Sequence, residues 1–457
     1  MLDFKLKNNI KDSIFAFGSF ISNPQILGDI SILRKGIEVM SSLDISTIDN
    51  ILRPAYYMVL AEAYRNCITI SGKGFINYDN DDIVLHIQNL RLAIRYSQRN
   101  KDFENIQCIN LGHALNDLKR YAEAIKCWES VIVNREHSTQ AVIGILLYNF
   151  SVCILGVVPL LPLKSMVLQF ISIGKKCLSD ALNCDGINRQ LENNIQDALS
   201  RVCEYERLFE EHLFQTDSTV QTNVLKDIST YSIWCINEVL YLNPLNDILA
   251  SAESAVDIID LSFLKDEKDV FVVLGYDELK QQYLFSREIL YESFTQQNDD
   301  KSKVSFRLAY SILDKLAGLI NSYFELGLKN SILSYNKIWF DKSRRINSEL
   351  AKTRNPYLIA LYWISRDIFL EGEEASDPEA ADIAKCRNFI EHRFVKIEDG
   401  DSFEELHNGL MLLIGRKTLY EKSLKLHCLV RNALLYFYFA VRWQDMNDQI
   451  NDVTVKS

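Results

Sequence analysis

The segment AKCRNFIEHRF, residues 384–394, brings an arginine, a carboxamide and an imidazole close together in the chain. Asn388 and His392 are four residues apart, so on a helix they share a face, and the long side chain of Arg387 can swing its guanidinium toward that face. An imidazole exchanges protons near neutral pH, and a guanidinium binds phosphate oxygens through paired hydrogen bonds. The three residue types therefore predict phosphodiester chemistry without a metal ion.

The spacing by itself is weakly specific, because an arginine followed by a histidine at this distance also arises by chance. Arg207 and His212 have the same spacing, but a leucine follows that arginine. Other Arg-Asn pairs, such as Arg431-Asn432, have no histidine at the required distance. The alternative role for Arg387 and His392 is a packing pair inside a helical bundle.

The elements that must position this segment are helices. Glycine and proline are scarce, at 17 and 7 of 457 residues, and hydrophobic residues make up 48%, which together favour an all-α protein. A length of 457 residues is typical of two or three domains. We predict a boundary in the polar stretch 214–223, with one domain at 1–213 and a second at 224–457.

The second domain shows five long helical patterns. Asn355 and Pro356 suit the cap and first turn of one helix, and Asp377-Pro378 suits the start of the helix that carries the AKCRNFIEHRF segment. We expect helices at Asp277–Gln297, Val304–Leu328, Pro356–Leu370, Glu379–Val395 and Leu419–Arg442.

The first domain shows paired helical patterns around residues 104–132. Gly112 and Ala124 are small where two antiparallel helices would approach each other, and Leu115 and Trp128 would fill the space between neighbouring hairpins. This pattern resembles a tetratricopeptide (TPR) repeat, and the flanking segments resemble it more loosely. A TPR-like array either serves as a packing scaffold or presents a concave surface to a partner protein.

The net charge, the cysteine spacing and the apolar segments indicate which ligands and which cellular compartment to expect. The net charge is −11, whereas a protein that coats long nucleic acids is usually basic. The ten cysteines show no zinc-ligand spacing, and the N-terminus lacks the apolar core of a signal peptide. The apolar segment 141–163 is interrupted by Asn149 and two prolines, so we read it as a buried helix rather than a membrane span. We therefore expect a cytoplasmic protein with no metal site, no cofactor and no membrane contact.

Four segments of the second half, WCINEVLYLNPLND, SREILYES, SILDKLAGLINSYF and KCRNFIEHRF, together resemble a HEPN domain of a bacterial branch often preceded by TPR-like repeats. The resemblance covers residues 225–445. HEPN domains are helical bundles found in many RNases of conflict systems, with an arginine and a histidine that are separated by four to six residues. Arg387, Asn388 and His392 match that signature.

This resemblance implies metal-independent cleavage of RNA, in which the 2′-hydroxyl attacks the neighbouring phosphate. His392 would be the general acid or base, Arg387 would hold the phosphate, and Asn388 would orient His392 or the backbone. HEPN domains usually pair, which implies a homodimer. The second helix of such bundles often supplies another polar group, and Asp314, which shares a helix face with Asn321, is the candidate; its alternative is solvated surface.

The basic segment 337–354 either steers RNA toward this acidic protein or forms a solvated face. Trp339, Phe340 and Tyr357 are expected in the core rather than stacked on bases, and His427 and Arg431 are expected to be structural.

We therefore predict an endoribonuclease of the toxin or anti-phage defence (abortive infection) type, as the resemblance implies, controlled by a partner or trigger protein on the TPR-like array. A non-catalytic adaptor or sensor and a peptide-binding solenoid remain alternatives.

Overall fold

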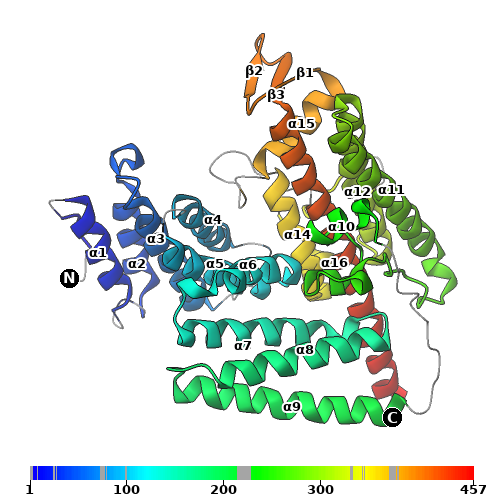
Figure 1. Ribbon diagram of the computed structural model, residues 1–457, viewed down its shortest axis with the longest axis horizontal. Helices are drawn as coiled ribbons and strands as arrows, with labels where there is room; N and C mark the ends of the chain where they lie inside the picture. Colours follow the sequence, from blue (N-terminus) through cyan, green and yellow to red (C-terminus); the bar gives the residue numbers. More distant parts are fainter. Residues whose placement is uncertain are drawn as a thin grey trace. The chain divides into compact units, whose positions relative to one another are not determined.

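The computed structural model of the protein describes residues 4–7, 9–23, 26, 28–72, 78, 80–97, 100–213, 228–329, 333–341, 343, 345–369, 377 and 380–456. Within these ranges the chain forms sixteen α-helices and one small sheet, which confirms the predicted helical class. The helices belong to two compact units, Met1–Thr219 and Val220–Ser457 (Figure 1). The predicted boundary segment 214–223 lies outside the described residues.

The N-terminal unit consists of helices that pack mainly against their neighbours along the chain. Helix α3 packs on α4, α5 on α6, and α7 on α8, which in turn packs on α9. The helices are α1 (Ile10–Ile21), α2 (Ile30–Ser41), α3 (Arg53–Ser71), α4 (Asp81–Tyr96), α5 (Lys101–Asp117), α6 (Tyr121–Val133), α7 (Gln140–Val157), α8 (Lys164–Leu182) and α9 (Arg189–Leu213), with 3₁₀ turns at Ile45–Thr47, Arg135–His137 and Val158–Leu160.

The hairpin of α5 and α6 shows why its pattern requires a glycine. A Cβ atom on Gly112 would lie 2.3 Å from Nε1 of Trp128, so the indole can lie across the helix only at a glycine. The indole N–H donates a hydrogen bond to the backbone oxygen of Ile109 at 3.2 Å. Trp128 therefore packs inside its own hairpin, a contact that the predicted role between neighbouring hairpins did not include.

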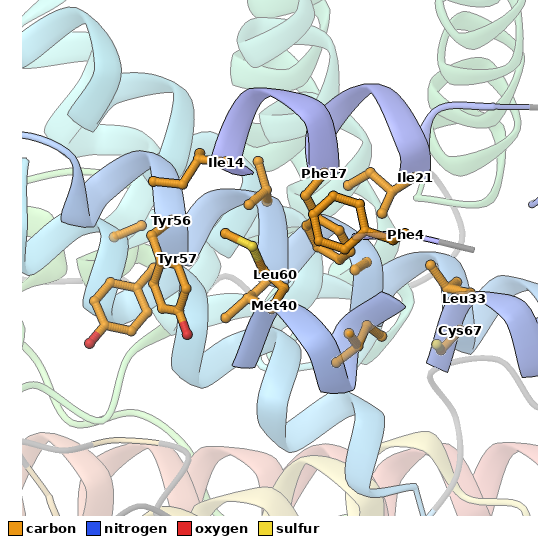
Figure 2. Packing of buried hydrophobic residues seen from close by; sticks show 14 of the residues in the cluster. Phe4, Ile14, Phe17, Ile21, Leu33, Met40, Tyr56, Tyr57, Leu60 and Cys67 are labelled. Atoms are coloured by element: carbon orange, nitrogen blue, oxygen red, sulfur yellow. The ribbon is translucent and has the colours of Figure 1, made fainter. Parts of the chain in front are cut away.

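The first three helices share a separate apolar cluster (Figure 2). Phe17, Leu33 and Met40 are completely buried in it, and the rings of Phe4 and Phe17 meet edge to face with their centroids 5.0 Å apart. These residues recur at helical spacing, as an amphipathic helix requires. The cluster closes the N-terminal end of the row of hairpins.

One helical segment, Gln140–Leu160, is long and apolar enough to cross a membrane by length and composition. Within it, Leu146, Phe150 and Ile154 are buried, and Ser151 donates a hydrogen bond to the backbone oxygen of Gly174 in α8 at 2.9 Å. These contacts agree with the reading of a packed helix, and one such segment is weak evidence for a membrane span.

The C-terminal unit is a helical bundle with a small sheet at one end (Figure 1). Strands β1 and β3 are parallel, β2 and β3 are antiparallel, and the strand order is β1-β3-β2. The elements are α10 (Thr230–Asn237), α11 (Val270–Thr295), α12 (Asp299–Tyr323), α13 (Ser348–Thr353), α14 (Pro356–Phe369), α15 (Ala381–His392), β1 (Phe394–Glu398), β2 (Phe403–Leu406), β3 (Met411–Gly415) and α16 (Arg416–Lys456), with 3₁₀ turns at Pro244–Asp247, Ala252–Ser254 and Glu267–Asp269.

Two buried ion pairs fasten the segment after α10 to the bundle. Arg431 of α16 donates to both carboxylate oxygens of Asp247, at 2.5 and 3.0 Å, and both residues are almost completely buried. Arg287 of α11 donates in the same way to Asp257, at 3.0 and 2.8 Å. Charges removed from water need such complete pairing. The quoted segments WCINEVLYLNPLND and SREILYES thus contribute to the packing of this unit.

His427 and Arg431 are both completely buried, which confirms their expected structural role. The His427 ring contacts the backbone oxygen of Ser423 through Nδ1 at 2.7 Å and the hydroxyl of Ser305 through Nε2 at 3.2 Å. Its burial lowers the pKa of His427 to about 4, so the ring is neutral at physiological pH.

Of the three aromatic residues expected in the core, Trp339 and Tyr357 are buried there, and Phe340 is half-buried with its ring centroid 6.3 Å from that of Tyr362. Trp339 is completely buried between the rings of Tyr335 and Tyr362, with centroid distances of 5.6 and 5.8 Å. Tyr357 is buried too, against Phe439. Both side chains contribute to the core, and neither is free to stack on a base.

Several helix boundaries differ from the prediction. Helix α11 begins at Val270 rather than Asp277, and α12 runs from Asp299 to Tyr323 rather than from Val304 to Leu328. The helix that carries Arg387 ends at His392 rather than Val395, because Arg393 is extended and Val395 pairs with Leu412 in the sheet. The last helix runs from Arg416 to Lys456, beyond the predicted Leu419–Arg442. The sheet itself was not predicted.

Candidate phosphodiester site

Helix α15 separates an apolar face from a polar one. Ile383, Cys386, Phe389 and Ile390 are buried at helical spacing against the bundle. Lys422 of α16 contacts the carboxylate of Asp382 in the first turn at 3.0 Å, which fixes the start of the helix. The opposite face is thereby directed to solvent, and it carries Asn388 and His392.

Arg387 lies at the edge between the two faces, half-buried. Its guanidinium lies over the ring of Tyr310 in α12, with the central carbon 5.3 Å from the ring centroid, which is a favourable cation–π distance. Its Nη1 donates to the side-chain oxygen of Asn388 at 3.3 Å. The sequence suggested that Asn388 orients His392 or the backbone, whereas in the structure its amide oxygen contacts the guanidinium.

His392 is the last residue of α15, and its side chain is exposed. The ring makes no hydrogen bond to any residue that the structure describes. Its position at the helix end follows from Arg393, whose backbone is extended with φ −140° and ψ −168°. The imidazole is therefore accessible to a ligand from solvent.

Arg307 of α12 caps the same helix end. Its Nη2 donates to the backbone oxygen of Ile390 at 2.6 Å, and its Nε lies 3.5 Å from the carboxylate of Glu391. A cation at a helix C-terminus compensates the partial negative charge of the free carbonyl groups. Arg307 could not be identified from the motif, because it lies on another helix and far from Arg387 and His392 in the chain.

Arg393 brings a further guanidinium to this end of α15. Its Nη1 donates to the backbone oxygen of Gly409 at 2.5 Å, and its central carbon lies 5.1 Å from the Phe389 ring centroid. Because β1 and β3 are parallel with Phe394 opposite Met411, the residues before each strand lie at the same sheet end. The tight turn His407–Asn408–Gly409, with φ values of 52°, 55° and 80°, is thus placed beside Arg393.

Asp314 lies one turn beyond Tyr310 on α12. Its carboxylate accepts a hydrogen bond from the backbone N–H of Tyr335 at 3.2 Å. Burial, and next the charge of Asp314, raise the pKa of the Tyr310 hydroxyl above its ordinary value, while the charge of Arg387 opposes the shift. Asp314 and Arg387 thus act on the same ring. Asn321, by contrast, closes the turn after α12 through two hydrogen bonds with Leu328.

The arrangement combines a solvent-accessible imidazole with three guanidinium groups, those of Arg307, Arg387 and Arg393. Arg307 already contacts the Glu391 carboxylate, whereas no acidic partner of Arg387 or Arg393 is found in the described part of the chain. An anionic ligand bound here would meet positive charge and a proton-exchanging group. Among the described residues, no three histidine, cysteine or acidic side chains are grouped to hold a metal ion.

A family model described as LA2681-like HEPN matches residues 296–444. The match includes α12, α14, α15, the sheet and most of α16, and therefore Tyr310, Asp314, Arg387 and His392. The comparisons with curated proteins and with solved structures found no match. No family match covers the N-terminal unit. The helical bundle, the arrangement on α15 and the family match together identify the C-terminal part of this chain as a HEPN domain.

Proposed function

We propose that the protein is a metal-independent endoribonuclease whose active site contains Arg387, Asn388 and His392, with Asp314 in a supporting position. The exposed His392 imidazole ends α15, the helix that also carries Arg387 and whose C-terminal backbone accepts from Arg307, and it has no hydrogen-bond partner among the described residues; this imidazole carries the proposal. An imidazole with a purely structural role is normally buried and bonded, as His427 is.

In the proposed reaction, a phosphoryl group of the RNA is transferred from the 5′-oxygen of one nucleotide to the 2′-oxygen of the preceding nucleotide. The 2′-oxygen forms a bond to phosphorus while its proton passes to a base, and the bond from phosphorus to the 5′-oxygen breaks as that oxygen accepts a proton. The products are a 2′,3′-cyclic phosphate and a 5′-hydroxyl end. His392 moves one of these protons, and Arg387 neutralises the charge that develops on the phosphate oxygens.

Asn388 and Tyr310 hold the Arg387 guanidinium in this reaction, one through its amide oxygen and the other through its ring. Asp314 acts indirectly, because one carboxylate oxygen already accepts from the backbone of Tyr335. One imidazole cannot both accept the 2′ proton and donate to the 5′-oxygen in the same step. A homodimer resolves this, since the partner subunit's His392 would supply the second proton-transfer group.

The biological role that we propose follows from the HEPN family. The protein would act in the cytoplasm, without a cofactor, as a toxin or defence RNase that is released when the N-terminal unit meets a partner or trigger. The second candidate is a HEPN adaptor that binds a partner protein without cleaving RNA. It predicts that removal of the His392 ring leaves the cellular phenotype unchanged.

Sequencing of RNA ends from cells tests the proposal. Wild-type protein is expected to produce cyclic-phosphate ends that are absent with His392→Ala, at equal protein levels. His137→Ala, which removes a half-exposed imidazole from the N-terminal unit, is the matched control and should behave as wild type. Identical RNA ends with wild type and His392→Ala, together with an unchanged phenotype, would support the adaptor instead.

A further inference from the structure

The N-terminal unit contains a polar pocket that the proposed RNase chemistry does not use. Its cavity measures about 160 Å³ and is lined by α3, α4, α5, α6 and α7. A cavity of about 150 Å³ accommodates a molecule as large as benzene, so this one admits one side chain and not a folded domain. The first helices of three consecutive hairpins, α3, α5 and α7, contribute to its wall.

Gln107 of α5 is the most informative residue of this pocket. Its side chain is completely buried, yet neither its amide nitrogen nor its amide oxygen has a hydrogen-bond partner among the described residues. Burial of an amide without hydrogen bonds destabilises a fold by roughly 1–3 kcal/mol. Native proteins rarely retain such a group, so a ligand that completes its hydrogen bonds is the physical reason to keep it.

A second unpartnered polar atom lies in the same pocket. His113 follows Gln107 on α5 and also lines the pocket. Its Nε2 is buried and has no hydrogen-bond partner in the described ranges. Burial lowers the pKa of His113 to about 4, so its ring is neutral near pH 7. His86 on the facing α4 is also neutral, because burial lowers its pKa to about 4, and its Nδ1 contacts the backbone oxygen of Ala61 at 2.8 Å. The deep part of the pocket is therefore polar and uncharged.

The charged groups of the pocket are at its rim. Arg65 lies 3.7 Å from the carboxylate of Glu62, and both side chains are about half exposed; Asp117 is exposed as well. The rim thus holds two carboxylates and one guanidinium that already faces a carboxylate. A phosphate-bearing ligand such as RNA would meet net negative charge here, which disfavours it.

The chemistry of Gln107 defines the ligand. A carboxamide offers one acceptor and two donor hydrogens, and another carboxamide can satisfy one of each in a pair of parallel hydrogen bonds. Three further carboxamides line the pocket from successive hairpins: Asn110 and Asn116 on α5, and Asn149 on α7. The nitrogen of Asn149 donates to the backbone oxygen of Ile145 at 2.8 Å and leaves its oxygen to accept. Such groups suit the N–H and C=O groups of an extended backbone that crosses from one hairpin to the next.

We propose that this pocket binds an extended peptide segment of a partner protein and holds the carboxamide of an Asn or Gln side chain against Gln107 and His113. This deepens the proposed regulatory role of the N-terminal unit by naming the class of its partner. Binding itself requires no RNA cleavage. Every test can therefore use full-length His392→Ala protein, and a failure of the RNase proposal leaves the outcome readable.

The experiment is a selection from a peptide display library. The central residue of each peptide is Asn, Gln, Leu, Glu or Lys, and the flanking residues are random. The probe proteins are the full-length chain and its Gln107→Met variant, which keeps the side-chain volume and removes the amide. Asn105→Leu is the matched control on the same helix, because the Asn105 amide is buried but already donates to Asn134 and Ser138. Thermal unfolding of all three proteins accompanies the selection.

We expect Asn or Gln at the centre to be enriched at least tenfold over Leu, Glu and Lys, and this preference to vanish with Gln107→Met. The Asn105→Leu variant should keep the preference but unfold at a lower temperature, whereas Gln107→Met should unfold at the wild-type temperature or above. Equal enrichment with Gln107→Met, no enrichment with any protein because the pocket holds only water, or enrichment of a random RNA pool in its place would each overturn the proposal.

Discussion

The guanidinium of Arg387 lies over the ring of Tyr310, with the central carbon of the first 5.3 Å from the centroid of the second. The contact joins α12 to α15, the helix that ends at the exposed His392. Tyr310 is buried, and its hydroxyl has a raised pKa, first because of that burial, so the ring is an uncharged platform. The guanidinium is thereby held at the edge of the polar face of α15.

Replacing Tyr310 tests whether this platform positions Arg387. Tyr310→Phe keeps the ring face and should keep RNA cleavage within about threefold of wild type, since a cation–π contact depends on the ring and not on the hydroxyl. Tyr310→Leu should lower single-turnover cleavage by about tenfold, the equivalent of ~1.4 kcal/mol in the barrier. Equal rates for the Phe and Leu variants would show that Tyr310 only fills space.

Replacing Arg387 by lysine tests the need for a planar fork. Lysine keeps the positive charge but cannot make two parallel hydrogen bonds to a phosphate. We expect Arg387→Lys to lower the cleavage rate at saturating RNA by about 10²-fold, the size of effect seen when one stabilising donor is lost. Arg345→Lys, at a site 79% exposed, is the control and should cleave as wild type does. Wild-type rates for both variants would remove Arg387 from the site.

The buried pair of Arg431 and Asp247 makes a prediction about stability. Arg431→Met leaves the Asp247 carboxylate buried without its partner, and should lower the free energy of unfolding of this unit by roughly 3–5 kcal/mol. Urea denaturation followed by circular dichroism measures the change. The double variant Arg431→Met/Asp247→Leu should recover part of that loss, because it also removes the unpaired charge. A double variant less stable than the single one would contradict this reasoning.

How far the fold follows from the sequence is clearest in the C-terminal unit. Helix α14 starts at Pro356 as predicted, because proline and the preceding asparagine give a strong local signal. The predicted end of α15 was wrong, because Phe394–Glu398 forms a strand only by pairing with Met411–Gly415. No local sequence pattern predicts that contact. Gly415 is required in that pairing, where a Cβ atom would lie 1.9 Å from the Gly400 oxygen.

The candidate site could be predicted only as far as it is local. Arg387, Asn388 and His392 lie within one helix, so their spacing in the sequence was enough to predict that they belong to the same part of the fold. Arg307 belongs to the same helix end only through tertiary packing, and no spacing rule could connect it to Ile390. The unpartnered amide of Gln107 is likewise invisible in the sequence, because a glutamine on a helix is ordinarily solvated.

His427 makes a prediction about pH. Its folded pKa of about 4 is below the unfolded value of 6.5, so the unfolded chain takes up the proton first as the pH falls. The stability contribution is therefore complete above pH 6.5 and declines between pH 6.5 and about 4. Wild-type protein should lose roughly 2–3 kcal/mol through this residue between pH 7 and 4.5. The free energy of unfolding of His427→Gln should fall less over that interval; an identical fall would contradict the assignment.

The decisive measurement is cleavage of a defined RNA by the purified full-length protein in the presence of EDTA. We expect products with a cyclic phosphate and a 5′-hydroxyl, a loss of about 10²–10⁴-fold in rate with His392→Ala, and no cleavage at a nucleotide whose 2′-hydroxyl is methylated. Cleavage at the wild-type rate by His392→Ala, or cleavage at the methylated nucleotide, would contradict the proposed function.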